Sequence, residues 1–261
     1  NMAQFTRKAK SGNDWTSKDL AAYNITVVLQ DAATFFETPY PYLPRPDINP
    51  DVLATMTCRY APDDDTYRFL RHLDLATHQV PAEKSAVDDF AVILLREMGY
   101  EPRRRALRTK KDLPFFVCGE NRHATTDVCL IDEDDIILLV QEDKPYMSTE
   151  DPVAQLIAKA IAAFATNNRT RVDILGLPPL TSKVIPGITM TGASPVFYKI
   201  GVSAELATAV GGGAYPDTQT VVYVHLPDIP RPERRWSEGM RPLDSRQAIL
   251  SCYEAFKRFV R

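Results

Sequence analysis

Two carboxylates and an ammonium group lie close to one another in an apolar part of the sequence. Asp127 precedes one apolar run, and Glu142, Asp143 and Lys144 close the next one. The acidic segment 132–135 separates the two runs, which predicts an antiparallel hairpin with its turn at this segment. If the last two residues of the segment form the centre of the turn, Asp127 lies directly across from Glu142, because strand side chains alternate with a period of two.

Such a pair of carboxylates needs a compensating charge. Like charges at this separation repel each other, and burial at the end of an apolar sheet disfavours both ionised forms. A divalent cation is the simplest compensation, and carboxylate oxygens suit Mg²⁺ or Mn²⁺. Lys144 shares the face of Glu142, whereas Asp143 points away. A metal there can activate water while Lys144 orients that water or neutralises phosphoryl charge, so the sequence predicts phosphoester chemistry.

These residues and their order resemble the PD-(D/E)XK nuclease superfamily. Asp127 matches the first acid, Glu142-Asp143-Lys144 matches the (D/E)-x-K element, and Thr126 stands at the place of the proline. The resemblance implies a restriction-endonuclease-like core, with a central mixed sheet flanked by helices. It further implies a Mg²⁺- or Mn²⁺-dependent nuclease that acts on DNA or RNA. Asp127, Glu142 and the Asp143 backbone carbonyl would be its metal ligands. Lys144 would be its catalytic ammonium.

A helix upstream of the hairpin carries further acids. Apolar residues recur at helical spacing through residues 81–100, and Gly99 stands where a C-terminal glycine is common. Members of the superfamily carry an acid near the start of such a helix, and similarity to archaeal junction resolvases implies that Asp88 is this acid. Glu83, about one turn earlier, is the alternative. Asp89 falls on the opposite face, where we expect it to be solvated.

A second helix is predicted after the hairpin. Asp151 is suited to be its N-cap and Pro152 its first residue, and the apolar residues that follow have helical spacing. Gln155 and Lys159 lie one turn apart on a flank of the apolar stripe. A glutamine at this place resembles the one that several nuclease branches use beside the metal, which implies a site role for Gln155.

Simpler interpretations stay open. Asp127 can merely end a strand, and Glu142 and Lys144 can form a cross-strand surface pair. A chain can also keep the architecture and lose the activity, because a fold does not by itself determine function. The alternative to a nuclease is therefore a catalytically inactive binding or interaction protein on the same fold. A hydrolase of another phosphoester is a third class.

The charge distribution leaves nucleic-acid binding open. A net charge of −3 is not that of a protein that coats DNA through phosphate contacts. One basic cluster directly follows the first core helix, where the loop of related folds borders the metal, and we expect it to contact phosphates. Its members are Arg103, Arg104, Arg105, Arg108, Lys110 and Lys111. Several arginines around Trp236 form a second cluster. Solvated basic loops are the alternative interpretation.

Other functional classes lack their sequence signals. No stretch approaches the roughly 18 consecutive apolar residues of a membrane span, and no apolar segment near the first residues resembles a signal peptide. The four cysteines are isolated, as is typical of reduced thiols, and the four histidines show no zinc spacing. We therefore expect an intracellular protein, cytoplasmic or nuclear, without a membrane partner. The sequence indicates no oligomeric state.

The 261 residues are 44% hydrophobic, which suffices for a sizeable core, and together with the resemblance we interpret the chain as an α/β protein. Residues 1–80 are interpreted as an N-terminal helical and proline-rich accessory layer, and residues 81–261 as the nuclease-like core with a C-terminal helix that Asp244 caps. The amino-acid sequence of the core also resembles a group of proteins from basidiomycete fungi. This second resemblance supports the fold and indicates no particular activity. The accessory layer has apolar segments at 17–22, 27–36 and 66–75, and later strands are expected near 188–191, 196–202 and 220–226.

Overall fold

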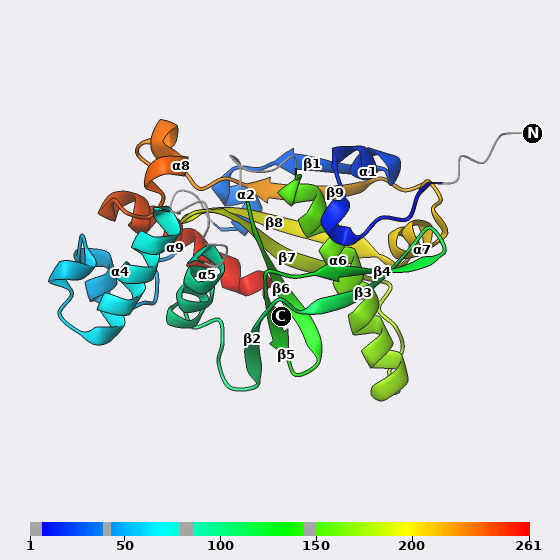
Figure 1. The fold of residues 1–261 in the computed structure, drawn as a ribbon, viewed down its shortest axis with the longest axis horizontal. Helices are drawn as coiled ribbons and strands as arrows, with labels where there is room; N and C mark the ends of the chain where they lie inside the picture. Colours follow the sequence, from blue (N-terminus) through cyan, green and yellow to red (C-terminus); the bar gives the residue numbers. More distant parts are fainter. Residues whose placement is uncertain (1–6, 39–42, 79–85, 144–149) are drawn as a thin grey trace, which may run out of the picture.

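The computed structural model describes residues 7–38, 43–78, 86–143 and 150–261. Within these ranges a seven-stranded mixed sheet forms the centre of the protein, and a two-stranded hairpin lies beside it (Figure 1). The expected α/β architecture with a large mixed sheet flanked by helices is confirmed. The strands are β1 (Ile25–Leu29), β2 (Arg105–Thr109), β3 (Asp112–Val117), β4 (Glu120–Thr125), β5 (Val128–Asp132), β6 (Asp135–Glu142), β7 (Ser182–Thr191), β8 (Ser194–Ser203) and β9 (Thr220–His225).

The strand order in the large sheet is β1-β9-β8-β7-β6-β5-β2. Strands β2, β5 and β6 are antiparallel neighbours, whereas β6 and β7 are parallel. Parallel neighbours require a crossover connection, and helix α6 supplies it between β6 and β7. The hairpin of β3 and β4 is inserted between β2 and β5 and pairs only with itself in the described part of the chain.

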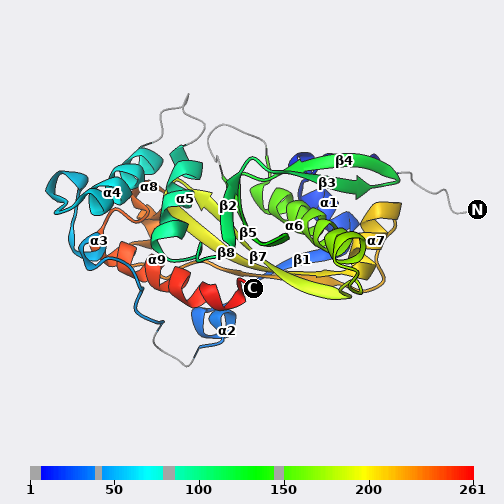
Figure 2. The ribbon, with the colours of Figure 1, turned by 90° about the horizontal axis from the view of Figure 1, so that it is seen from below.

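Helices cover both faces of the large sheet (Figure 2). Helices α5 and α9 share one apolar cluster with Leu138 and Val140 of β6, and α6 shares another with Leu139 of the same strand. None of the helices in the described ranges is long and apolar enough to cross a membrane. The helices are α1 (Ser17–Ala22), α2 (Ala32–Phe36), α3 (Pro50–Ala54), α4 (Asp64–Thr77), α5 (Ala86–Glu97), α6 (Pro152–Arg169), α7 (Ala204–Gly212), α8 (Arg235–Glu238) and α9 (Leu243–Phe256).

The two helices that flank the hairpin follow the sequence prediction. Asp151 Oδ1 accepts a hydrogen bond from the Ala154 N–H at 3.0 Å, and Pro152 is the first residue of α6. The described part of α5 ends at Glu97, and Gly99 follows it with a φ of 74°. Glycine tolerates this left-handed conformation without the steric cost of a Cβ, which explains its position after the helix.

The N-terminal segment is not purely helical, contrary to the expectation. The apolar segment 27–36 divides between strand β1 and helix α2, and β1 pairs in parallel with β9 at one edge of the large sheet. Four of the five residues of β1 are β-branched, which favours an extended conformation. The segment before residue 80 therefore contributes a strand to the sheet of the predicted core as well as helices that cover it.

The C-terminal helix begins slightly earlier than predicted. Helix α9 starts at Leu243 with Pro242 as its N-cap residue, so the assignment of Asp244 as N-cap is wrong. Asp244 lies in the first turn, and its carboxylate accepts a hydrogen bond from Arg231 Nη1 at 2.9 Å. A carboxylate in the first turn of a helix is favoured by the helix dipole, so the acidic signal was located correctly but assigned to the wrong position.

Candidate functional site

A bulge in the β5–β6 hairpin decides which side chains meet at its open end. Beyond a register shift in the middle of the hairpin, Val128 pairs with Val140. The next pair in this register places Asp127 opposite Gln141, so the expected pairing of Asp127 with Glu142 is wrong. A bulge adds one residue to one strand. The apolar pattern could not reveal it, because both strands are buried on both faces and show no clear alternation.

The Glu142 and Gln141 side chains consequently point to opposite faces of the sheet. Glu142 follows the alternation of Leu138 and Val140, which pack on the side of α5. Gln141 follows that of Leu139, which packs on the side of α6. Glu142 is only 8% exposed, and its backbone N–H donates a hydrogen bond of 3.0 Å to Asp127 Oδ2. The Asp127 carboxylate therefore lies at the end of the sheet, where it contacts the backbone of β6.

Lys110 connects Asp127 with helix α5. The Lys110 Nζ atom lies 2.8 Å from Asp127 Oδ1 and 2.7 Å from Asp88 Oδ2. Asp88 is buried in the first turn of α5, and Asp89 beside it is exposed, as the sequence predicted. The fold thus brings two of the predicted site acids to one cationic group. Glu83, the alternative to Asp88, lies outside the described residues.

A second ammonium group approaches Asp127 from α6. The Lys159 side chain is 1% exposed, and its Nζ lies 3.9 Å from Asp127 Oδ2. The same Nζ donates a hydrogen bond to Gln141 Oε1, and Gln141 Nε2 donates one of 2.9 Å to the Glu142 carbonyl. These contacts tie α6 to the ends of both strands of the hairpin. They satisfy a buried ammonium that would otherwise be costly.

Burial and ion pairing shift the pKa values of these groups in opposite directions. Burial alone would raise the pKa of Asp127, but the two ammonium groups and the Glu142 N–H bring it below its usual value. Burial lowers the pKa of Lys159, and the nearby Asp127 carboxylate opposes that shift. Burial also acts to lower the pKa of Lys110, but its hydrogen bonds to Asp127 and Asp88 raise the pKa above its usual value. The Asp127 carboxylate is therefore kept ionised.

Asp143 turns away from this cluster, in agreement with the prediction. Its Oδ2 accepts a hydrogen bond of 2.9 Å from Thr191 Oγ1, and its N–H donates one of 2.9 Å to the Met190 carbonyl. Both partners belong to β7. Burial raises the pKa of the Asp143 carboxyl group above its usual value. Lys144 lies outside the described residues, so its position beside Glu142 stays a prediction.

Gln155 lies on α6 one turn before Lys159, but its amide contacts the N-terminal segment. The Gln155 Nε2 atom donates a hydrogen bond of 2.7 Å to the Asn13 carbonyl. Asn13 Oδ1 in turn accepts one of 3.0 Å from the Thr125 N–H of β4. Gln155 therefore anchors residues of the N-terminal segment over α6. Its implied role beside a metal stays a prediction.

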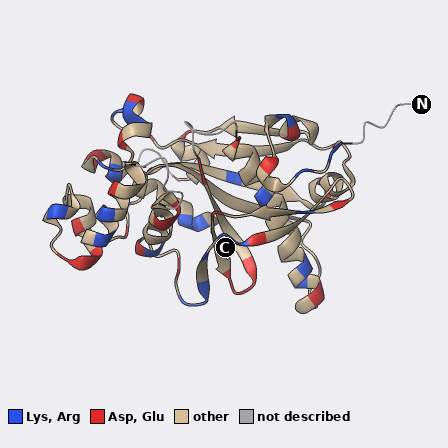
Figure 3. Ribbon diagram, viewed as in Figure 1, with Lys and Arg blue, Asp and Glu red and all other residues tan. Residues whose placement is uncertain are grey.

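The predicted phosphate-binding cluster extends along the edge strand β2. Arg104 and Arg105 pair with Glu133 and Asp132 at the turn end of the hairpin, where Figure 3 shows basic and acidic segments side by side. Lys110 lies at the other end, against the carboxylates. The cluster as a whole therefore does not lie beside the carboxylates. Of its remaining members, Arg103 and Arg108 are exposed and Lys111 is half-buried.

Sequence reasoning missed the roles of three residues at this site. The sequence groups Lys110 with the basic cluster, places Lys159 on a helix flank and indicates no contact for Gln141. The sequence contains a signal for Lys159, because it is a cation within a helix segment that is otherwise alanine, isoleucine and leucine. A polar side chain in such a helix is buried and needs a partner. The contacts of Lys110 have no comparable signal.

Asp88 and Asp127 flank a position that suits a hard cation. Their oxygens are the donor type that Mg²⁺ and Mn²⁺ prefer, and the Lys110 ammonium now lies between them. The Lys110 side chain is 56% exposed, so it can withdraw into solvent. Among the described residues, no group of three His, Cys, Asp or Glu side chains gathers closely enough to hold a metal ion. The described residues therefore offer a cation two carboxylates, those of Asp88 and Asp127, with the Lys110 ammonium between them.

Comparison with known proteins provides no assignment. Neither a scan against models of protein families nor a search of curated proteins found a match to this chain.

Proposed function

We propose that this protein is a divalent-metal-dependent phosphodiesterase that acts on nucleic acid. The observation that carries the proposal is the meeting of Asp88 and Asp127 at one cationic group beside Glu142. Apart from the inserted β3–β4 hairpin, the chain order α5, β2, β5, β6, α6, β7 supports a restriction-endonuclease-like core. Its strands form part of a mixed sheet that helices flank, which is the architecture that the PD-(D/E)XK resemblance implies.

The proposed metal ligands are oxygens at the open end of the hairpin. Asp127 and Glu142 would hold Mg²⁺ or Mn²⁺ together with the Asp143 backbone carbonyl, and Asp88 would face the ion from α5. The bound ion supplies Lewis-acid polarisation of a phosphoryl oxygen and lowers the pKa of a bound water. Lys110 leaves its place between the carboxylates and is then available to contact a phosphate.

The neighbouring side chains have separate roles in this proposal. Lys159 is a positioning residue, because it holds Gln141 and keeps Asp127 ionised from the side of α6. Lys144 is the catalytic ammonium that neutralises charge developing on the phosphoryl group. Exposed Arg108 lies on β2 between the hairpin turn and Lys110, so this edge strand offers phosphate contacts that lead toward the carboxylates.

The test of activity is a panel of labelled DNA and RNA substrates, incubated with Mg²⁺, Mn²⁺ or EDTA. Wild type should cleave at least one substrate with metal and none with EDTA. Lys144→Ala should lower cleavage by a factor of ~10² or more, because it removes stabilisation of the transition state. Lys144→Arg should restore it only in part, since a guanidinium cannot place so compact a charge. Lys257→Ala, which removes an ion pair with Glu254 of α9, is the matched control.

The test of the metal site is thermal unfolding with and without Mn²⁺. A bound ion should raise the melting temperature by mass action, and Asp127→Asn should abolish the rise. Equal Mn²⁺ binding by wild type and Asp127→Asn in calorimetry would exclude Asp127 as a ligand.

One observation favours the second candidate, a catalytically inactive binding protein. Lys110 compensates both Asp88 and Asp127, so the charge balance of the site does not require a metal. In that case the basic side chains of β2 would serve binding alone. A metal-loaded wild-type protein that binds nucleic acid but cleaves no member of the panel would establish this candidate and reject the nuclease.

A further inference from the structure

A cleft lies on the α9 face of the sheet, far from the carboxylates. It has a volume of about 460 Å³ and lies over the first part of β7 and the neighbouring parts of β8 and β9. Lys183, near the start of β7, forms an ion pair of 3.4 Å with Asp135, the first residue of β6. Glu142 is the last residue of β6. Because a strand rises about 3.3 Å per residue, roughly 20 Å separates the cleft from the carboxylates.

The alternation of β8 explains why a cleft forms there. Phe197, Lys199 and Gly201 point to the same face of the sheet. Phe197 is covered by α9, where its ring centroid lies 5.0 Å from that of Phe256. Helix α9 ends at Phe256, so the following positions of β8 emerge from under it. A Cβ added at Gly201 would meet no atom within 4 Å, so the floor of the cleft is open at this glycine.

Cations dominate the lining of the cleft. Lys199 Nζ donates hydrogen bonds to the Phe35 carbonyl at 2.7 Å and to Glu37 Oε1 at 3.3 Å, which fixes it in place. Arg261 donates from Nε to the Arg258 carbonyl at 2.7 Å, which leaves the rest of its exposed guanidinium directed to solvent or a ligand. Lys183 pairs with Val202 across the sheet, so its side chain points to the other face and leaves Lys199, Arg258 and Arg261 as the cations of the cleft, with Glu37 as the acid. The lining therefore carries a net positive charge.

Aromatic and aliphatic surfaces accompany these cations. Lys199 Nζ lies 4.8 Å from the ring centroid of Phe259 and 6.0 Å from that of Tyr223. Tyr223 pairs with Lys199 across the sheet and is 38% exposed, and Val184 nearby is also exposed. A half-exposed ring beside fixed cations suits a ligand that joins a flat ring to an anion, because ring faces stack and cations hold the anion.

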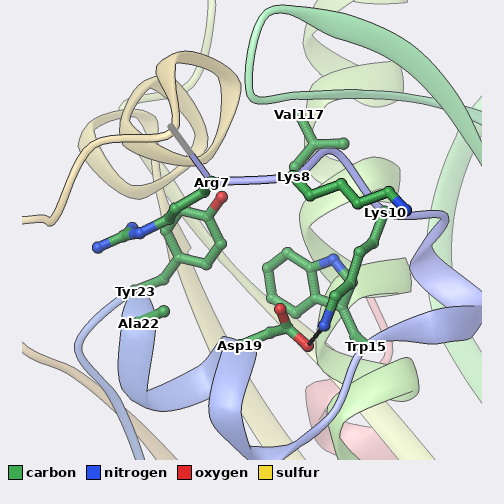
Figure 4. A pocket seen from close by; sticks show the side chains of 8 residues that line it. All are labelled: Arg7, Lys8, Lys10, Trp15, Asp19, Ala22, Tyr23 and Val117. Carbon is green, nitrogen blue, oxygen red and sulfur yellow. Dashed lines mark hydrogen bonds and ion pairs between the residues drawn. The ribbon is translucent and has the colours of Figure 1, made fainter. Parts of the chain in front are cut away.

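The cavity under the N-terminal segment does not offer the same combination (Figure 4). Its volume is about 200 Å³, less than half that of the cleft. Lys10 pairs with Asp19 at 2.8 Å, and the Arg7 guanidinium lies 4.9 Å from the ring centroid of Tyr23. Lys10, Arg7 and Tyr23 of this cavity therefore already have partners within it, whereas Tyr223 and Arg261 of the cleft are exposed.

We propose that the cleft binds a nucleoside 5′-phosphate, either free or at the end of a strand. The phosphate contacts Arg261, with Lys199 and Arg258 beside it, and the base lies against Tyr223 above Gly201. Small-molecule sites typically have volumes of about 300–1,000 Å³, and this cleft falls in that range. A bare phosphate ion would leave the aromatic part of the cleft unused. The proposal is independent of the carboxylate site.

The experiment measures binding of AMP to the full chain in EDTA, which prevents a contribution from metal at the carboxylates. AMP should bind, and adenosine and inorganic phosphate should each bind at least ~10-fold more weakly, because each supplies only half of the contacts. Arg261→Gln should weaken AMP binding by about 10-fold through loss of a charge-assisted contact. Asp127→Asn should bind AMP as wild type does. Arg59→Gln, an exposed arginine elsewhere, is the matched control.

A steric variant tests the position of the ligand. Gly201→Val should fill the floor of the cleft and weaken AMP binding by about 10-fold or more, and its β-branched side chain suits a strand. Gly201→Ala is a milder second variant if valine lowers the melting temperature. A 5′-phosphorylated trinucleotide that binds more tightly than AMP, with the same sensitivity to Arg261→Gln, would identify a strand end as the source of the phosphate. Absence of AMP binding, or wild-type affinity in both Arg261→Gln and Gly201→Val, would overturn the proposal.

Discussion

Arg246 and Lys159 are both almost completely buried, and they are satisfied in different ways. Arg246, in α9, donates hydrogen bonds to five backbone carbonyls, from Nε and both Nη atoms. Lys159, in α6, contacts side chains instead, namely the Gln141 amide and the Asp127 carboxylate. Both replace the solvation that burial removes, but only Lys159 does so with groups that can themselves bind a ligand.

The difference separates a structural cation from a functional one. The carbonyls that Arg246 contacts belong to Val52, Thr55, Met56, Met240 and Arg241, so this guanidinium joins α3 and the segment after it to the region before α9. A guanidinium has five N–H donors, and all five are used there. Lys159 instead lies beside a carboxylate at the open end of the hairpin. A buried cation fully satisfied by backbone is expected to stabilise, and one beside a carboxylate is expected to tune chemistry.

The largest expected effect is on stability, from Arg246→Met. Methionine keeps much of the volume but leaves five carbonyls without their donor, so the free energy of unfolding should fall by about 4 kcal/mol. Urea unfolding measures this loss. Arg241→Gln, whose guanidinium is partly exposed and 3.7 Å from Asp74, should change stability by less than about 1 kcal/mol. Equal effects of both substitutions would remove the structural role assigned to Arg246.

Lys159→Met should show the reverse pattern. Removal of a buried ammonium also removes its desolvation penalty, and Asp127 keeps Lys110 and the Glu142 N–H, so stability should change by less than about 2 kcal/mol. Cleavage should nevertheless fall by about 10²-fold, because Asp127 and Gln141 lose the group that positions them. The readout beyond activity is Mn²⁺ affinity, which should change in this variant but not in Arg246→Met. A variant with wild-type cleavage would show that Lys159 is structural like Arg246.

Lys110→Met removes the exposed cation at Asp127, for comparison with the buried cation Lys159 at the same carboxylate. Lys110 competes with a metal for the position between Asp88 and Asp127, so its removal should tighten Mn²⁺ binding by about 10-fold, which is roughly 1.4 kcal/mol. Isothermal calorimetry measures this directly. Lys183→Met, at the far end of the sheet, is the control and should leave Mn²⁺ binding unchanged. Weaker binding in Lys110→Met would contradict the exchange of ammonium for metal.

The smallest expected effect is on the pH dependence of stability. The pKa of Asp127 is lower in the folded protein than its ordinary value of 3.8, so the carboxylate contributes stability above that value. The contribution is lost as the pH falls through the lowered pKa of the folded state. In EDTA, wild type should therefore lose more melting temperature than Asp127→Asn between about pH 5 and pH 3. Parallel curves for the two proteins would show that Asp127 is not stabilised by its ammonium neighbours.

The sequence by itself determined the local features of the site. Asp151 and Pro152 mark the start of α6, because capping and the fixed φ of proline act within a few residues. The alternation of buried and exposed acids placed Asp88 inward and Asp89 outward, because helical periodicity decides which face each residue takes. The helix before the hairpin and the helix after it followed from the same local periods.

Only the tertiary structure decided which of these residues meet. The bulge in the β5–β6 hairpin moved Gln141, and not Glu142, opposite Asp127, since one inserted residue changes the face of every side chain beyond it. Lys110 reached Asp88 because β2 pairs with β5 as the last strand of the sheet and α5 packs above it. The cleft at Gly201 exists because α9 ends before β8 does. Periodicity fixes the direction of a side chain, but registers and element lengths fix its partners.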